Sequence, residues 1–110
     1  MSSIRSMTPI FRTLAAVCLT WGLNASLAHA EGDAARGEAR AASCAACHGP
    51  GGRSLNPSVF PAIAGMEPEQ MVTLLKAYRD GDKVNPIMSP QAQGLSDQDI
   101  LDLAAYFSNQ

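Results

Sequence analysis

The sequence has few cysteines, histidines and aromatic residues, and no segment that reads as a β-strand. Its 110 residues include three cysteines, two histidines and one tryptophan, and aromatic residues make up 5%. A chain of this length holds at most one ordinary domain, which excludes a large multidomain enzyme. No segment alternates apolar and polar residues with a period of two, so the sequence predicts an all-α protein.

Residues 1–30 have the order of a secretory signal peptide. Arg5 and Arg12 precede an apolar stretch over residues 14–27, and residues 28–30 form the small-x-small pattern of a cleavage site. An uncleaved membrane anchor is the alternative. It fits less well, because spanning a bilayer takes roughly 20 apolar residues and this run is shorter and contains polar side chains.

Cleavage after Ala30 would leave residues 31–110 as an exported domain. This part of the chain has six Lys and Arg residues against ten Asp and Glu residues, a formal charge of −4. A domain with that charge lacks the basic surface typical of nucleic-acid binding. It also has 13 alanines among its apolar residues, a thin core for so small a domain. We therefore expect something other than side chains to fill its middle.

The pattern of apolar residues, caps and breakers predicts three helices joined by two long loops. The helices begin after Asp33, at Pro68 and after Ser96, and the first two end near Ala46 and at Gly81. Asp99 stands where a capping box at the start of the last helix requires an acid. Prolines and glycines mark residues 49–65 and 82–95 as ordered loops. Loops of this length in a small domain usually wrap around something.

Cys44, Cys47 and His48 form the motif that carries chemistry, with the Cys-x-x-Cys-His spacing of covalent haem attachment. Two thiols three residues apart lie on one helical turn, where each can add to a vinyl group of the porphyrin. The histidine that follows can reach the iron from the same side. We therefore predict one haem c, with Cys44 and Cys47 forming thioethers and His48 binding the iron.

Three other interpretations of the motif have less support. A structural zinc site needs four ligands, and residues 31–110 have no further cysteine or histidine, so a carboxylate or a partner chain would have to complete it. A redox-active dithiol of the thioredoxin type needs a strand, helix and strand around it. A disulfide between Cys44 and Cys47 would close a very small loop and stabilise the fold little.

With these features in place, residues 31–110 resemble the small class I cytochromes c of bacteria. The resemblance rests on the helix around Gly37, the attachment motif, residues 60–65, the loop containing Met88 and the final helix. It implies the class I cytochrome c fold, in which helices and long loops wrap around one covalent haem. It also implies that the last helix crosses the first at Gly37, with Tyr106 or Phe107 over the glycine.

A second axial ligand must come from another residue type, since no second histidine remains. Met66, Met71 and Met88 are the candidates with a soft neutral donor. Met71 lies on the apolar stripe of the middle helix, which favours a place in the core. Met66 follows His48 closely, whereas Met88 lies on a proline-stiffened loop that can reach across the ring. We predict Met88 as the ligand, and the resemblance agrees.

The resemblance further implies that the carbonyl of Pro61 accepts a hydrogen bond from the ligand histidine. Tyr78 and Asn85 are candidate donors to the sulfur of Met88, and Arg53 and Arg79 are candidate partners of a haem propionate.

Axial ligation by histidine and methionine raises the reduction potential and leaves no position on the iron for oxygen or peroxide. We therefore expect a soluble periplasmic electron carrier rather than an enzyme, which exchanges electrons with unidentified redox proteins. Two alternatives remain open. One is a permanent electron-transfer subunit of a larger periplasmic oxidoreductase, and the other is a haem protein with a labile sixth ligand that binds small molecules.

Overall fold

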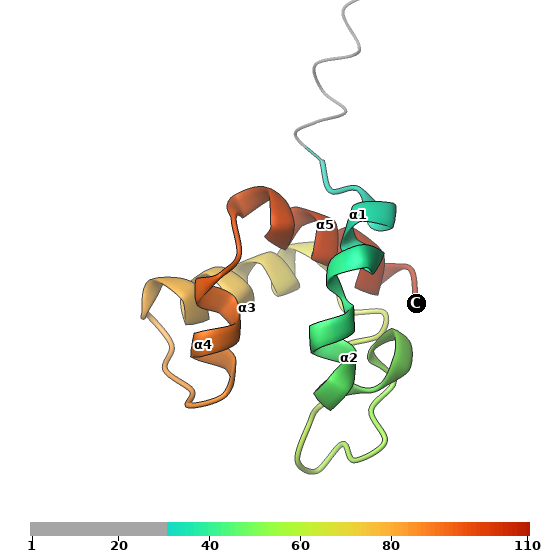
Figure 1. Ribbon diagram of the computed structural model, residues 1–110, viewed down its shortest axis with the longest axis horizontal. Helices are drawn as coiled ribbons and strands as arrows, with labels where there is room; N and C mark the ends of the chain where they lie inside the picture. Colours follow the sequence, from blue (N-terminus) through green and yellow to red (C-terminus); the bar gives the residue numbers. More distant parts are fainter. Residues whose placement is uncertain (1–30) are drawn as a thin grey trace, which may run out of the picture.

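The computed structural model describes residues 31–110, which form five α-helices, one short 3₁₀ helix and no strand (Figure 1). The elements in chain order are α1 (Ala34–Arg40), α2 (Ala42–His48), η1 (Pro50–Gly52), α3 (Pro68–Asp80), α4 (Met88–Gln93) and α5 (Asp97–Ser108). The predicted all-α class is confirmed. No helix in this part of the chain is long and apolar enough to cross a membrane. The predicted signal peptide, residues 1–30, lies outside the described residues.

Helices α1 and α5 cross at close range, and a glycine permits the approach. A Cβ atom at Gly37 would overlap the carbonyl oxygen of Asp102 and lie 2.8 Å from the Cβ atom of Tyr106. Any side chain at this position would therefore push the two helices apart. The predicted crossing at Gly37, with Tyr106 beside the glycine, is confirmed (Figure 1).

The first predicted helix is divided into α1 and α2 at Ala41. The N–H group of Ala41 lies 2.9 Å from the carbonyl oxygen of Gly37 and 3.2 Å from that of Glu38, which tightens the chain at the end of α1. Helix α2 ends at His48, because Gly49 has a φ of 84° that continues no right-handed helix. The two helices together cover the predicted range, with one tightened turn between them.

The predicted helix caps are also confirmed. The carboxylate of Asp33 accepts a hydrogen bond from the N–H group of Arg36 at 2.9 Å. At the start of α5, Ser96 and Asp99 each accept a hydrogen bond from the other's backbone, as in a capping box. Gly81 ends α3 in the left-handed conformation. These short-range signals fix the helix boundaries independently of the core.

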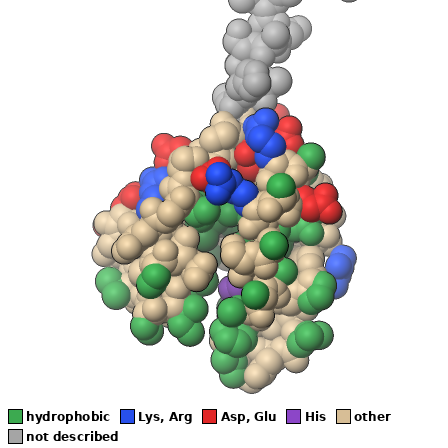
Figure 2. All heavy atoms as spheres, in the orientation of Figure 1, with side chains coloured by type: hydrophobic (Ala, Val, Ile, Leu, Met, Phe, Trp, Pro, Cys, Tyr) green, Lys and Arg blue, Asp and Glu red, His purple; other side chains and the backbone are tan. Residues whose placement is uncertain are grey.

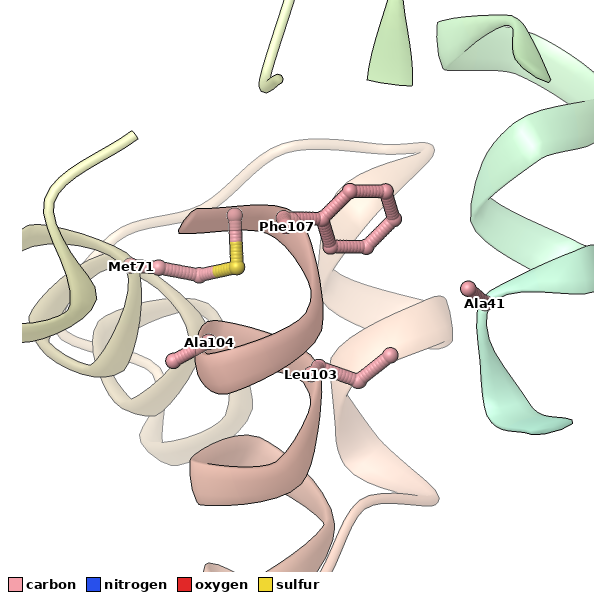
Figure 3. Packing of buried hydrophobic residues seen from close by; sticks show 5 residues of the cluster. All are labelled: Ala41, Met71, Leu103, Ala104 and Phe107. Atoms are coloured by element: carbon pink, nitrogen blue, oxygen red, sulfur yellow. The ribbon is translucent and has the colours of Figure 1, made fainter. Parts of the chain in front are cut away.

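Helix α5 lies at the centre of a small apolar core (Figure 3). The core cluster consists of Ala41, Met71, Leu103, Ala104 and Phe107. Figure 3 shows Met71 of α3 on one side of Phe107 and Ala41 on the other. Phe107 and Leu103 are each 1% exposed. The core thus connects α5 with α3 on one side and with the junction of α1 and α2 on the other.

The prediction of a continuous loop over residues 82–95 is wrong in part, because this segment contains α4. Pro90 is the third residue of α4, and the first turn of a helix tolerates proline since its N–H groups have no partner within the helix. Ala92 is fully buried and anchors the short helix. Helix α4 packs against α3.

A buried carboxylate joins the start of α1 to α5. Asp102 is 2% exposed and accepts hydrogen bonds from the backbone of Asp33 at 2.8 Å, from Nε of Arg36 at 2.9 Å and from Nε2 of Gln98 at 2.9 Å. The hydrogen bond from the Arg36 guanidinium, with those from Asp33 and Gln98, lowers the pKa of Asp102 from 3.8 to about 2 despite its burial. The folded state therefore favours the ionised carboxylate.

We expect Asp102→Asn to lower the free energy of unfolding at neutral pH by about 1–3 kcal/mol, because three donors lose a charged acceptor that is itself buried. A carboxylate whose pKa is depressed on folding stabilises the folded state above its unfolded pKa, and this contribution is lost as the pH falls through the folded pKa. For Asp102 the loss falls between about pH 4 and pH 2. Urea unfolding of the holoprotein, followed by far-ultraviolet circular dichroism across this range, should show a shallower pH dependence in the variant. Equal slopes in the two proteins would contradict the role of Asp102.

Candidate haem-binding site

A cavity of about 290 Å³ opens between two parts of the molecule. Residues of α2 and the loop after it line one side, residues of α3 and α4 line the other, and Leu103 and Phe107 of α5 complete the lining. Figure 1 shows α2 on one side of the molecule and α3 with α4 on the other. Figure 2 shows the hollow with apolar side chains on both sides and a histidine inside it. The lining is mostly apolar and includes Phe60, Ile63, Leu74, Leu75, Leu103 and Phe107.

The two cysteines of the motif lie one turn apart on α2, and both line the cavity. They are not bonded to each other. Cys44 is half-buried beside the core, whereas Cys47 is exposed. Burial raises the pKa of the Cys44 thiol. The two thiols are therefore placed along one edge of the cavity and available for bonds to a ligand inside it.

His48, the last residue of α2, is 9% exposed and lines the cavity. Its Nδ1 atom lies 2.6 Å from the carbonyl oxygen of Pro61. A carbonyl can only accept a hydrogen bond, so Nδ1 must carry the proton, and Nε2 of the neutral ring keeps its lone pair. This is the protonation pattern of a histidine that binds a metal through Nε2. The ring also packs edge-on against Phe60.

The loop that carries Pro61 is held by hydrogen bonds on both sides of the proline. The carbonyl of Gly52 accepts hydrogen bonds from Ile63 at 2.9 Å and Ala64 at 3.1 Å. The hydroxyl of Ser54 donates to the carbonyl of Phe60, directly before the proline. These contacts fix the Pro61 carbonyl and, through it, the plane of the histidine ring.

All three candidate methionines line the cavity. Met71 is 4% exposed and belongs to the core cluster, so its predicted core position is confirmed. Met66 packs against that cluster from the loop before α3. Met88 is half-buried at the first position of α4, on the wall opposite α2. The structure thus places one methionine across the cavity from His48, in addition to two that are packed on the core.

The other polar residues considered from the sequence are divided between the cavity and the surface. Tyr78 and Asn85 line the cavity. Arg79 bonds instead to Asp97 at 2.7 Å and to Asp80 at 2.8 Å, which raises the pKa of its guanidinium. Asp80 is the next residue in the chain, whereas Asp97 is brought to Arg79 only where α3 meets α5, so sequence patterns do not reveal the pairing with Asp97.

The chemistry of these donors fits a covalently bound haem. The cavity offers one imidazole with a free Nε2 lone pair, three thioethers and two thiols, in an apolar surrounding. Within residues 31–110 no three or more His, Cys, Asp and Glu side chains gather where they could hold a metal ion by themselves. Soft donors on two facing walls suit an iron held in a flat ring between them.

Residues 34–110 match the Cytochrome c family model, so the chain belongs to the cytochrome c family. It therefore carries haem c and is an electron-transfer protein. Both agree with the sequence-based resemblance to class I cytochromes c.

Three relatives illustrate the range of similarity. Cytochrome c-554(548) of Halomonas halodenitrificans is 46% identical over 72% of this chain and 98% of its own length. Cytochrome c4 of Pseudomonas aeruginosa is 43% identical over 90% of this chain. The cytochrome subunit of sulfide dehydrogenase of Chlorobaculum tepidum is 39% identical over 67% of this chain and 66% of its own length. The chain spans about half the length of the cytochrome c4 relative, 48% of it.

We expect that replacing Cys44 and Cys47 together by alanine abolishes covalent haem attachment, because both thiols on the edge of the cavity are removed. Acid-acetone extraction after maturation in a cytochrome-producing host should release all haem from this variant and none from the wild type. Ser43→Ala is a matched control, since Ser43 lines the same cavity but has no thiol. Haem that resists extraction from the double variant would contradict the assignment.

Proposed function

We propose that this protein is a soluble periplasmic carrier of single electrons, with His48 and Met88 as the axial ligands of the iron and Cys44 and Cys47 as the sites of attachment. The proposal rests on one observation: His48 and Met88 lie on facing walls of one apolar cavity whose edge carries both thiols. The predicted cleavage of residues 1–30 would deliver the domain to the periplasm.

Haem c supplies an iron that gains and loses one electron. The protein's own residues set how readily it does so. The carbonyl of Pro61 accepts the Nδ1 proton of His48, which fixes the ring and makes Nε2 a better donor. Bound to the iron, the thioether of Met88 would favour the reduced state, and the apolar lining would keep water away. With His48 and Met88 both holding the iron, no position would remain for a substrate.

Electrons must enter and leave through the open side of the cavity. Val59 and Ile87 line it and are also 61% and 52% exposed. They come from loops on opposite walls, so a redox partner that covers them approaches the haem edge. The formal charge of −4 on residues 31–110 suggests a partner whose docking face is basic around an apolar centre. The donor and acceptor proteins are expected to bind only transiently.

A second candidate function is that of a permanent electron-transfer subunit of a periplasmic oxidoreductase. The similarity to the cytochrome subunit of a sulfide dehydrogenase favours it. The chemistry at the iron is the same in both cases, and only the lifetime of the complex differs.

The mass of the native particle separates these two functions. We expect the haem protein in a periplasmic extract of the source organism to sediment as a small species close to the mass of one chain. Analytical ultracentrifugation with detection of haem absorbance measures this directly. Haem absorbance that sediments only with a much larger particle would favour the permanent subunit.

We expect Met88→Ala to keep its haem attached but to lower the reduction potential by on the order of 0.1 V or more, within the range of about 0.8 V that axial ligands span. Removing the thioether also opens the iron to other ligands. Potentiometric titration and addition of carbon monoxide to the reduced protein measure the two effects.

Met66→Ala is the matched control, because Met66 lines the same cavity from another segment. We expect its reduced form not to bind carbon monoxide, and we expect the same of the wild type. If Met66→Ala binds carbon monoxide and Met88→Ala does not, Met66 is the ligand. A wild-type protein that binds carbon monoxide rapidly would favour the haem protein with a labile sixth ligand.

A further inference from the structure

Met88 stands at a point in the chain that has little stability of its own. It is the first residue of α4, a helix of six residues. Isolated helices of this length do not persist in water, since forming the first turn costs more conformational entropy than its hydrogen bonds return. The position of the Met88 side chain must therefore be set by contacts outside the helical backbone.

Asn85 supplies those contacts from three residues earlier in the chain. Its side-chain oxygen Oδ1 accepts hydrogen bonds from the backbone N–H groups of Ile87 and Met88, each at 2.9 Å. Both N–H groups lie at the beginning of α4, where no helical carbonyl is available to them. The side chain of Asn85 thus caps the turn that carries the methionine.

Ser89 closes the same turn from the other side of Met88. Its hydroxyl oxygen accepts a hydrogen bond from the backbone N–H group of Asn85 at 2.9 Å, and its own N–H group donates to the Asn85 carbonyl at 3.0 Å. Residues 85 and 89 therefore bond to each other in both directions across the methionine. Pro86, with its fixed φ, removes further freedom from the enclosed segment.

None of the hydrogen bonds described for Asn85 and Ser89 involves the Met88 sulfur. The rest of α4 is anchored separately by Ala92, which is fully buried. Loss of the Asn85 side chain should therefore loosen the turn around Met88 while the remainder of the helix stays packed.

We propose that Asn85 is a positioning residue that holds the Met88 thioether in place, with Ser89 as its partner, and that this pair sets how often the sulfur leaves the iron. The inference rests on the proposed ligation by Met88. When the sulfur leaves, only the iron–sulfur bond breaks, and an external neutral ligand can take its position without any change of oxidation state. The rate at which such a ligand binds therefore measures how firmly the turn of residues 85–89 holds Met88.

The test is the rate at which imidazole binds to the oxidised holoprotein, measured by stopped-flow absorbance at imidazole concentrations where loss of the thioether limits the rate. We expect Asn85→Ala to raise this limiting rate about fivefold, the factor that corresponds to ~1 kcal/mol for a lost helix cap. Asn85→Asp keeps an acceptor oxygen at the same position and should bind imidazole at close to the wild-type rate. Ser89→Ala should raise the rate by less than Asn85→Ala.

Asn56→Ala is the matched control. Asn56 is an exposed asparagine of the loop on the opposite wall, and within residues 31–110 its Oδ1 accepts a hydrogen bond only from the hydroxyl of Ser58. We expect its limiting rate to equal that of the wild type. An increase in Asn56→Ala as large as in Asn85→Ala would show general loosening and overturn the proposal, as would an unchanged rate in both Asn85→Ala and Ser89→Ala.

Met88→Ala separates failure of this proposal from failure of the ligand assignment. If Met88→Ala binds imidazole without the slow step and Asn85→Ala behaves as the wild type, only the positioning role is wrong. If Met88→Ala retains the slow step, another residue is the ligand, and both proposals fail. Should Asn85→Ala mature too poorly to purify, the comparison of Ser89→Ala with Asn56→Ala gives the same decision.

Discussion

The close crossing of α1 and α5 is the contact on which the other parts of the site depend. Gly37 lets the two helix backbones approach, and the buried carboxylate of Asp102 ties the start of α1 to the middle of α5. Helix α2 continues directly from α1, so the crossing also determines where the attachment motif lies. At its other end, α5 accepts a hydrogen bond at the carbonyl of Phe107 from the N–H group of Gly65, which closes the loop that carries Pro61. Helix α5 thus determines the positions of both the attachment motif and the Pro61 carbonyl that orients its histidine.

Local signals were sufficient to predict the three main helices, because their boundaries are written in short stretches of sequence. Each start or stop signal acts within one turn of the helix end that it marks; the signals are Asp33, Pro68, Gly81 and the Ser96–Asp99 pair. Predicting these helix ends therefore requires no knowledge of the tertiary structure. The attachment motif was equally clear, since its spacing alone places two thiols on one turn. Its placement beside an apolar cavity agrees with that prediction.

The parts that sequence reasoning missed depend on contacts between distant segments. Pro86 and Pro90 predict a loop over the residues that form α4. The stabilising contacts are a buried alanine, Ala92, and the cap from Asn85, neither of which a periodic pattern reveals in six residues. The pairing of Arg79 with Asp97 was missed for the same reason, because its two partners belong to different helices. The asparagine–proline pair before Met88 was the one local signal that a turn begins there.

The hydrogen bond between Asp33 and Asp102 joins residues that are 69 positions apart. Contacts of such long range are slow to form, since the chain must close a large loop before any of their energy is gained. A polypeptide that enters a compartment from its amino end presents Cys44 and Cys47 well before α5 has arrived. In such a chain the two thiols would lie on a polypeptide that cannot yet complete its core. The proposed export of residues 31–110 would therefore leave haem attachment a period of time in which folding does not compete with it.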